Sequence, residues 1–297
     1  MKIAFIINPY SGTPIFVDRV HHLIRRHLGS VHDINIFESN KPADAHKFSK
    51  QAAEEGMDIV VAVGGDGTVN NTAQALLNTD TALGVIPAGS GNGFAKNLNL
   101  PTRSDHAVKQ FLDPKIRMID VGQIGDSIFL VSCGLGWEAV IATLFEGSKM
   151  RGPVPYATAA IATFTQYEPQ KIEVTTDTGW SYTGRPMFFT IANMGEYGFG
   201  ANIAPDARPD DGLLDICILP RHSPLDAMKY APELFLKNID SVPGYIGKLA
   251  QEVKVKRTFE ANIHLDGTPV LAGTEVTVRI LKHALKIAVK PKSRHTN

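Results

Sequence analysis

Short apolar runs alternate with amphipathic segments over the first 120 or so residues. Four of the runs are predicted as strands: Lys2–Ile7, Ile34–Glu38, Ile59–Val63 and Ala82–Ile86. The segments between and after them have a helical spacing of apolar side chains or open a helix: Phe16–Leu28, Ala43–Glu55, Val69–Leu77 and Phe94–Asn97. Strands that alternate with helices across short connections indicate a parallel sheet covered by helices.

The pattern changes after Asp120, where apolar residues alternate over short stretches separated by turn residues. The predicted strands here are Ile119–Ile124, Ser127–Cys133, Lys171–Thr176, Thr183–Ala192, Gly212–Leu219, Glu252–Phe259, Ala261–Leu265 and Glu275–Ile280. This spacing is typical of an antiparallel β domain. Two helical insertions are predicted, over Trp137–Tyr167 and over Ser223–Leu236, the second with Ser223 as its N-cap.

The 297 residues are enough for two domains. We predict a Rossmann-like, three-layer α/β nucleotide-binding domain over 1–122 and an antiparallel β-sandwich over 123–283. The last predicted strand, Ala284–Val289, is expected to return the segment 284–297 to the first domain.

Composition excludes several classes of function. The formal net charge is zero, which argues against a nucleic-acid partner. Cys133 and Cys217 both lie in apolar stretches, which favours buried free thiols in a reducing compartment over a disulfide. The apolar run at the N-terminus is too short for a secretory signal, and no apolar run is long enough to span a bilayer. We therefore expect a cytoplasmic protein.

The C-terminal end is basic. Six cations and no acidic residue follow Val276: Arg279, Lys282, Lys286, Lys290, Lys292 and Arg294. Two interpretations remain open at this point, a solvated basic face or an attraction to anionic lipid headgroups that would bring the protein transiently to a membrane.

A glycine-rich turn follows the third predicted strand. Gly64–Thr68 reads Gly-Gly-Asp-Gly-Thr, which allows backbone N–H groups to approach a phosphate closely. The single carboxylate of Asp66 is costly beside an anion unless it holds a cation or accepts a hydrogen bond. The turn therefore predicts a nucleotide phosphate with Mg²⁺, and the alternative is an ordinary tight turn.

Two further loops follow predicted strands. Asn8–Gly12 offers an amide and a hydroxyl, and Pro87–Lys96 offers three glycines together with Ser90, Asn92 and Lys96. The carboxyl ends of parallel strands share one edge of a sheet, which is where open α/β sheets bind ligands. Three such loops at one edge favour phosphate binding over helix capping.

These three loops together resemble the diacylglycerol kinase catalytic domain, in the form found in bacterial lipid kinases related to sphingosine and ceramide kinases. The resemblance continues through the second domain in three segments: Asn193–Asn202, Ala204–Asp215 and His264–Pro269. It covers nearly the whole chain in the same order. It implies an ATP- and Mg²⁺-dependent lipid kinase that acts at a membrane surface, and it makes a homodimer an expectation.

The resemblance also assigns roles to residues. Asp66 matches the carboxylate of the nucleotide–Mg²⁺ site, and Asp266 matches the general base that accepts the proton of the lipid hydroxyl. Asp211, with backbone carbonyls near Arg208 and Leu213, matches a structural Mg²⁺ site of oxygen ligands. The positions that match the phosphate cradle and the nucleotide contacts are Gly64, Gly65, Gly67, Thr68, Asn8, Ser11, Gly12, Gly89, Ser90 and Asn92.

Some family positions differ here. Thr268 and Asn71 replace glutamates, Gln74 replaces an asparagine, and Gly93 replaces an aspartate. Asp266 followed by glycine is by itself a hairpin signal. Two alternatives therefore stay open: a kinase for a soluble acceptor, as in NAD kinase, and a nucleotide-binding protein with weak catalysis. Apolar residues of the two helical insertions are expected in the core or in a cleft for an acyl chain.

Overall fold

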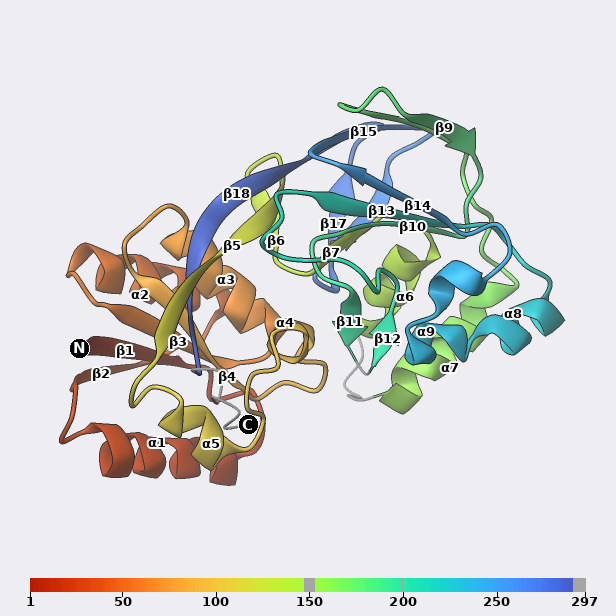
Figure 1. Ribbon diagram of the computed structural model, residues 1–297. Helices are drawn as coiled ribbons and strands as arrows, with labels where there is room; N and C mark the ends of the chain where they lie inside the picture. Colours follow the sequence, from red (N-terminus) through yellow and green to blue (C-terminus); the bar gives the residue numbers. More distant parts are fainter. Residues whose placement is uncertain (147–152, 199, 291–297) are drawn as a thin grey trace, which may run out of the picture. The chain divides into compact units, whose positions relative to one another are not determined.

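The computed structural model describes residues 1–146, 153–198 and 200–290 (Figure 1). The chain forms two compact units. The first contains Met1–Ile119 and the chain from His283 onward, and the second contains Asp120–Lys282. Each unit has its own hydrophobic core.

The first unit is built on a parallel sheet with the strand order β2-β1-β3-β4-β18. Its strands are β1 (Lys2–Ile7), β2 (Asp33–Glu38), β3 (Ile59–Gly64), β4 (Ala82–Pro87) and the end of β18 (Glu275–Val289). β3 and β4 are buried along their whole length. Their side chains are apolar on both faces, as expected for the strands of a parallel sheet that helices cover on both sides.

Helices cover the two faces of this sheet, with α1 and α5 on one face and α2 and α3 on the other (Figure 1). They are α1 (Pro14–Leu28), α2 (Pro42–Glu54), α3 (Asp66–Leu76), α4 (Gly93–Asn97) and α5 (Ser104–Lys109). Thr13 caps α1 by accepting the N–H of Phe16 at 3.2 Å. The expected start of α3 at Val69 was wrong. Asp66 to Thr68 already form its first turn, because the glycines allow the chain to turn directly into the helix.

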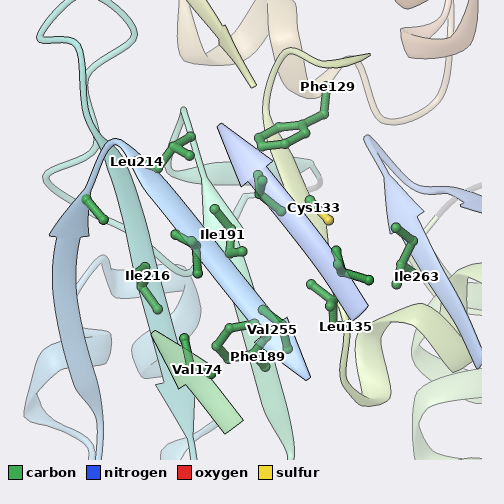
Figure 2. Close-up of a cluster of buried hydrophobic side chains, with 14 of the residues drawn as sticks. Phe129, Cys133, Leu135, Val174, Phe189, Ile191, Leu214, Ile216, Val255 and Ile263 are labelled. Carbon is green, nitrogen blue, oxygen red and sulfur yellow. The ribbon is translucent and has the colours of Figure 1, made fainter. Parts of the chain in front are cut away.

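The second unit is an antiparallel β-sandwich. One sheet has the order β14-β13-β10-β7-β16-β17, and the facing sheet contains β18-β15-β8-β9. Figure 2 shows side chains from both sheets, such as Ile191 and Val255, meeting in one apolar core. The strands are β5 (Lys115–Ile124), β6 (Ser127–Phe129), β7 (Ser132–Gly134), β8 (Ile172–Thr176), β9 (Ser181–Gly184), β10 (Phe188–Ala192), β11 (Glu196–Gly198), β12 (Ala201–Asn202), β13 (Leu214–Leu219), β14 (Ile246–Ala250), β15 (Glu252–Arg257), β16 (Ala261–Leu265) and β17 (Thr268–Ala272).

Several predicted strands differ from the observed ones. The single strand expected over Thr183–Ala192 is two, β9 and β10, and the two strands expected near the C-terminus are one, β18. β18 passes from the second unit to the first at His283. At this residue the backbone has a φ of +49°, which is unusual for a residue other than glycine. Ile287 then pairs in parallel with Leu83 of β4.

The helical insertions are α6 (Trp137–Glu146), α7 (Pro153–Phe164), α8 (Pro224–Tyr230), α9 (Glu233–Leu236) and the short 3₁₀ helix η1 (Ile239–Ser241). The predicted N-cap is confirmed, because the hydroxyl of Ser223 accepts the N–H of Asp226 at 3.1 Å. The two cysteines are buried free thiols, as expected. Among the described residues, every helix is too short or too polar to cross a bilayer.

The apolar residues of the second insertion divide into two sets. Tyr230 and Leu234 pack against a buried cluster of the second unit. Four others face solvent and form what we call the α8–α9 apolar face: Leu225, Met228, Phe235 and Leu236. The expectation of a core position was therefore wrong for Leu225, Met228 and Phe235, and it was correct for Ile239. In the first insertion Trp137 is buried and Leu144 is exposed. Met150 lies outside the described residues.

Candidate active site

The three predicted phosphate loops lie at the carboxyl ends of adjacent strands in the first unit. The strand order β2-β1-β3-β4 reverses between β1 and β3, and ligands of open α/β sheets bind at such a point. The loops contact one another there. The Asn8 amide donates to the Thr68 hydroxyl at 3.1 Å, and the Ala88 N–H donates to the Gly64 carbonyl at 2.8 Å.

Missing side chains allow this close approach. A Cβ on Gly89 would lie 2.6 Å from the Cα of Gly65, and a Cβ on Gly64 would lie 2.5 Å from the Thr68 hydroxyl. Gly12 has a φ of +85°, which favours glycine. A Cβ on Gly67, by contrast, would meet no atom within 4 Å. The edge of the sheet is thus lined by backbone, which is what a phosphate cradle needs.

Asp66 is the first residue of α3 and points at the Pro87–Lys96 loop. Its carboxylate accepts the N–H of Phe94 at 3.2 Å. Burial raises the pKa of Asp66, while the N–H groups of Phe94, Gly93 and Asn92 lower it. The net penalty on the charged form would be relieved by a bound cation, so this carboxylate fits a metal ion that accompanies a nucleotide.

Asn92 and Ser90 differ in how their loop holds them. The Asn92 amide donates to the Gly89 carbonyl at 2.7 Å and accepts the Gly89 N–H at 2.9 Å, with a φ of +51°. The observed role of Asn92 is therefore to close its own loop. Ser90 is exposed, and Ser11 is half-buried with its N–H donating to the Asn8 carbonyl. Their contacts to a nucleotide stay predictions.

In the second unit, the backbone segment Leu130–Ser132 is bound by Asp266, the predicted base. The carboxylate of Asp266 accepts the N–H of Leu130 at 2.8 Å, of Val131 at 2.8 Å and of Ser132 at 3.1 Å. Asp266 also begins the two-residue turn between β16 and β17, with a φ of +50° followed by +83° at Gly267. The hairpin interpretation is thus confirmed, and the same residue clamps a distant segment.

Sequence reasoning missed Asn193, which also holds this segment, and Asp120, which is hydrogen-bonded to Asn193. Asn193 is fully buried and donates from its amide to the carbonyls of Leu130 and Asp120, each at 2.9 Å. The buried carboxylate of Asp120 accepts the N–H of Gly212 at 2.6 Å. A carboxylate between the apolar neighbours Ile119 and Val121 was the available signal, because a buried acid requires donors.

Carboxylates also gather around the predicted structural metal site. Burial, followed by the charges of Asp211 and Asp206, raises the pKa of Asp215 to about 7. Asp211 is exposed and accepts the N–H of Leu213 at 3.0 Å. Within the described part of the chain, side chains of His, Cys, Asp and Glu make no complete metal site. A cation near Asp211 would therefore need backbone carbonyls, and those of Arg208 and Leu213 remain the predicted ones. Oxygen ligands of this kind suit Mg²⁺.

The basic C-terminal segment is mostly strand. Lys286 pairs with Asp80 at 2.7 Å, and Arg279 pairs with Glu252. Over Glu275–Ile280, the first part of β18, every second side chain is buried, as in an ordinary half-buried strand. Lys292 and Arg294 lie outside the described residues. These ion pairs favour the structural interpretation of the basic segment over headgroup attraction.

Comparison with known families matches both parts of the chain. Residues 2–124 match the model of the diacylglycerol kinase catalytic domain. Residues 131–289 match the model described as the YegS C-terminal NAD kinase beta sandwich-like domain. The second match alone spans more than half of the chain, and both matches follow the α/β and β-sandwich division described above.

Individual relatives agree over nearly the full length. The chain is 28% identical over 275 residues to a diacylglycerol kinase of Bacillus subtilis, covering 90% of each protein. It is 26% identical to a protein of Alcanivorax borkumensis named "Probable lipid kinase YegS-like", over 86% of this chain and 87% of that one. A crystal structure of "a putative diacylglycerol kinase" from Bacillus anthracis has the same fold, with a TM-score of 0.81 at 21% identity, covering 98% of this chain and 96% of that one.

Proposed function

The chain belongs to the family of the diacylglycerol kinase catalytic domain and is a lipid kinase, and we propose that it transfers the γ-phosphate of ATP to a hydroxyl of a diacylglycerol-like or sphingoid-like lipid. The observation that carries this proposal is the meeting of three glycine loops at the strand-order reversal of the first unit. Phosphoryl transfer depends on positioning and charge neutralisation, and a backbone-lined edge supplies both to phosphates.

In this proposal the three loops hold the phosphates of ATP. The N–H groups of the glycines and the start of α3 face the anion, since a helix N-terminus has partial positive charge. Asp66 holds Mg²⁺, which neutralises charge on the phosphates when bound. Asp211 with the carbonyls of Arg208 and Leu213 holds a second, structural Mg²⁺.

Asp266 is proposed as the group that accepts the proton of the lipid hydroxyl. A base must be ionised and fixed in place. Three backbone N–H groups do both for Asp266, because they stabilise its charged form and restrain its carboxylate. Thr268, which replaces the usual glutamate, is exposed at the start of β17 and takes no part in the three hydrogen bonds of this clamp.

The decisive experiment offers labelled ATP and Mg²⁺ to the purified chain with a panel of lipids in mixed micelles and with NAD as a soluble acceptor. We expect a labelled phospholipid as the product, and we expect its formation to require Mg²⁺. Labelled NADP with no labelled lipid would instead identify a soluble-acceptor kinase. ATP binding measured by calorimetry, without transfer to any acceptor, would leave only nucleotide binding.

We further propose that the lipid is reached at a membrane surface through the α8–α9 apolar face. Leu225 is 80% exposed and Met228 is 74% exposed, on helices whose other side packs against the second unit. Large apolar side chains grouped on one exposed surface commonly mark an interaction site. Insertion into the interfacial region would remove these side chains from water.

Vesicle sedimentation tests this surface. Changing both Leu225 and Met228 to Ser should weaken binding to lipid vesicles about tenfold or more, since each buried CH₂ contributes roughly 0.8 kcal/mol. Leu271→Ser is the matched control, because Leu271 is also exposed but lies on β17. Equal loss in both variants would contradict the proposal. Gel filtration of the same proteins tests the expected homodimer and would show whether the face binds a second copy instead.

A further inference from the structure

Four polar side chains form a row against the outer face of the six-stranded sheet in the second unit: Glu138, Thr190, Tyr197 and His264. In the strand register, Thr190 of β10 and His264 of β16 lie on either side of Gly134 of β7. Residues in register across neighbouring strands share a face, so Thr190 and His264 point to the same side. Their neighbours Cys133, Ile191 and the other inward residues form the sandwich core on the opposite side.

Gly134 gives these polar groups their space. A Cβ at this position would lie 2.2 Å from the Nε2 of His264 and 2.5 Å from the Cγ of Glu138. Glu138 is in the first turn of α6 and is 3% exposed, and His264 is 4% exposed. A glycine in the middle strand therefore lets a buried acid and a buried imidazole approach the same point.

Hydrogen bonds and a ring contact connect the row. Oε1 of Glu138 accepts the N–H of Gly136 at 3.1 Å, the N–H of Phe189 at 3.2 Å and the hydroxyl of Thr190 at 3.3 Å. The Thr190 hydroxyl is also hydrogen-bonded to the hydroxyl of Tyr197.

The row continues from Tyr197 to the turn that contains Asp266. The Tyr197 ring meets the His264 ring edge to face at a centroid distance of 6.0 Å. Nδ1 of His264 accepts the N–H of Gly267 at 3.3 Å. The row thus ends on the residue that follows Asp266, inside the two-residue turn.

Burial disfavours the charged forms of two side chains in the row, His264 and Glu138. Burial lowers the pKa of His264 to about 4, so its ring is neutral near pH 7, and the hydrogen bond from the Gly267 N–H assigns the acceptor role to Nδ1. Burial also raises the pKa of Glu138 to about 7. Its Oε2 has no hydrogen-bond partner among the described residues. Apolar side chains would fill this layer without that desolvation cost, so stability alone does not explain the row.

We propose that Glu138, Thr190, Tyr197 and His264 are positioning residues that fix the Asp266–Gly267 turn, and with it the Leu130–Ser132 segment, for phosphoryl transfer. This inference rests on the proposed function. Asp266 clamps the amides of Leu130–Ser132 from one side, and Asn193 binds the carbonyls of Leu130 and Val131 from the other. Asn193, which binds the clamp, and Tyr197, which belongs to the row, lie only four residues apart in the segment Asn193–Asn202.

The test uses two substitutions of one residue. His264→Leu removes the acceptor for the Gly267 N–H, whereas His264→Asn keeps an oxygen at the position of Nδ1. We expect His264→Leu to lower kcat about thirtyfold with the KM for ATP changed less than twofold, and His264→Asn to restore most of the loss. Tyr197→Phe, which keeps the ring and loses the bond to Thr190, should lower kcat about fivefold.

A core variant separates positioning from general destabilisation. Val174→Ala removes buried methyl groups from β8, on the facing sheet, and should lower the melting temperature while leaving kcat unchanged. If His264→Leu stays folded and keeps the kcat of the wild type, the proposal is overturned. The same holds if kcat falls equally in His264→Leu and His264→Asn.

Hydrogen exchange distinguishes failure of this inference from failure of the proposed function. The amides of Leu130–Ser132 and Gly267 should exchange about tenfold faster in His264→Leu than in the wild type, and at an unchanged rate in Val174→Ala. This readout needs no turnover. A wild type without phosphate transfer to any lipid would contradict the proposed function, and unchanged exchange in His264→Leu would contradict the positioning row.

Discussion

The phosphate-loop edge of the first unit and the Leu130–Ser132 clamp of the second are built in opposite ways. The edge consists of backbone, with glycines where a Cβ would collide with another loop. The clamp consists of side chains, with Asp266 and Asn193 bonding to the backbone of a distant segment. The edge is therefore sensitive to a side chain added at Gly64 or Gly89, and the clamp is sensitive to loss of the Asp266 or Asn193 side chain. Substitutions in each should fail in different ways.

Asp66 is the exception within the first unit, because the edge depends there on a side chain. Asp66→Asn keeps an acceptor for the Phe94 N–H and removes a charge that burial penalises, so the melting temperature should stay the same or rise. Turnover should fall about a thousandfold or more, because the charge proposed to hold Mg²⁺ is lost. Kinase assays and thermal melts measure both effects. Asp18→Asn, on the exposed side of α1, is the control, and retained turnover in Asp66→Asn would remove this residue from the site.

Asp266→Asn should damage both activity and stability, unlike Asp66→Asn. The new amide would direct N–H groups at the N–H groups of Leu130, Val131 or Ser132, so we expect a loss of about 2–3 kcal/mol in the free energy of unfolding. Loss of the proposed base should lower kcat about a hundredfold or more. Urea titration and kinetics give the two values.

Asp177→Asn is the matched control for that experiment. Asp177 also accepts two backbone N–H groups in the second unit, those of Gln251 and Glu252, at 3.0 and 3.1 Å. Both N–H groups donate to Oδ1, which Asn retains, so Asp177→Asn should change stability little and keep kcat. If Asp266→Asn loses only stability, Asp266 is a structural clamp and the proton acceptor must be sought elsewhere.

A pair of glycines tests the claim that the edge cannot accept a side chain at a position where two loops touch. Gly89→Ala places a Cβ against the Gly65 backbone and should raise the KM for ATP about tenfold, with a stability loss of about 1–3 kcal/mol. Gly67→Ala has open space and lies in the first turn of α3, so it should be neutral or slightly stabilising. Any rise in KM for Gly67→Ala would then report a phosphate close to its backbone. Equal stability in both variants would refute the packing argument.

The last prediction concerns the pH dependence of stability and tests a buried acid of the second unit, Glu138. The folded-state pKa of Glu138 is raised to about 7 from its ordinary 4.5, so the folded state keeps this proton where the unfolded state loses it. Stability from this group is complete below pH 4.5 and is lost as the pH rises through about 7, by roughly 3 kcal/mol. The difference in unfolding free energy between wild type and Glu138→Gln should follow this curve. A constant difference between pH 4.5 and 7.5 would contradict the raised pKa.

The contrast between the two regions also explains what the sequence could predict. The phosphate loops were found because each is contiguous and follows a buried strand, so Gly64–Thr68 and Pro87–Lys96 can be recognised locally. The family resemblance supplied Asp266 and Asp211. The start of α3 was missed because the residues Asp66–Thr68 are equally typical of a glycine-rich turn and of the first turn of a helix.

The clamp could not be predicted from local pattern. Asp266 lies 134 to 136 residues from the amides it binds, and Asn193 lies 73 residues from Asp120. Such pairs form only when β7, β10 and β16 become neighbours in one sheet, which periodicity does not show. The prediction for the residues of the α8–α9 apolar face was wrong for a related reason. The spacing of apolar residues identifies one face of a helix but does not show whether another part of the protein covers that face.

The strand β18 has a consequence for synthesis. Its far end, at Ile287, pairs with β4, so the sheet that begins with the first residues of the chain is finished by some of the last. Chains grow from the N-terminus, so β4 emerges long before its final partner and waits with one open edge during translation of nearly 200 residues. An open strand edge invites pairing with another chain. The newly made protein is therefore most exposed to aggregation on the ribosome, and ribosome-bound chains ending before 283 are where a chaperone requirement should be sought.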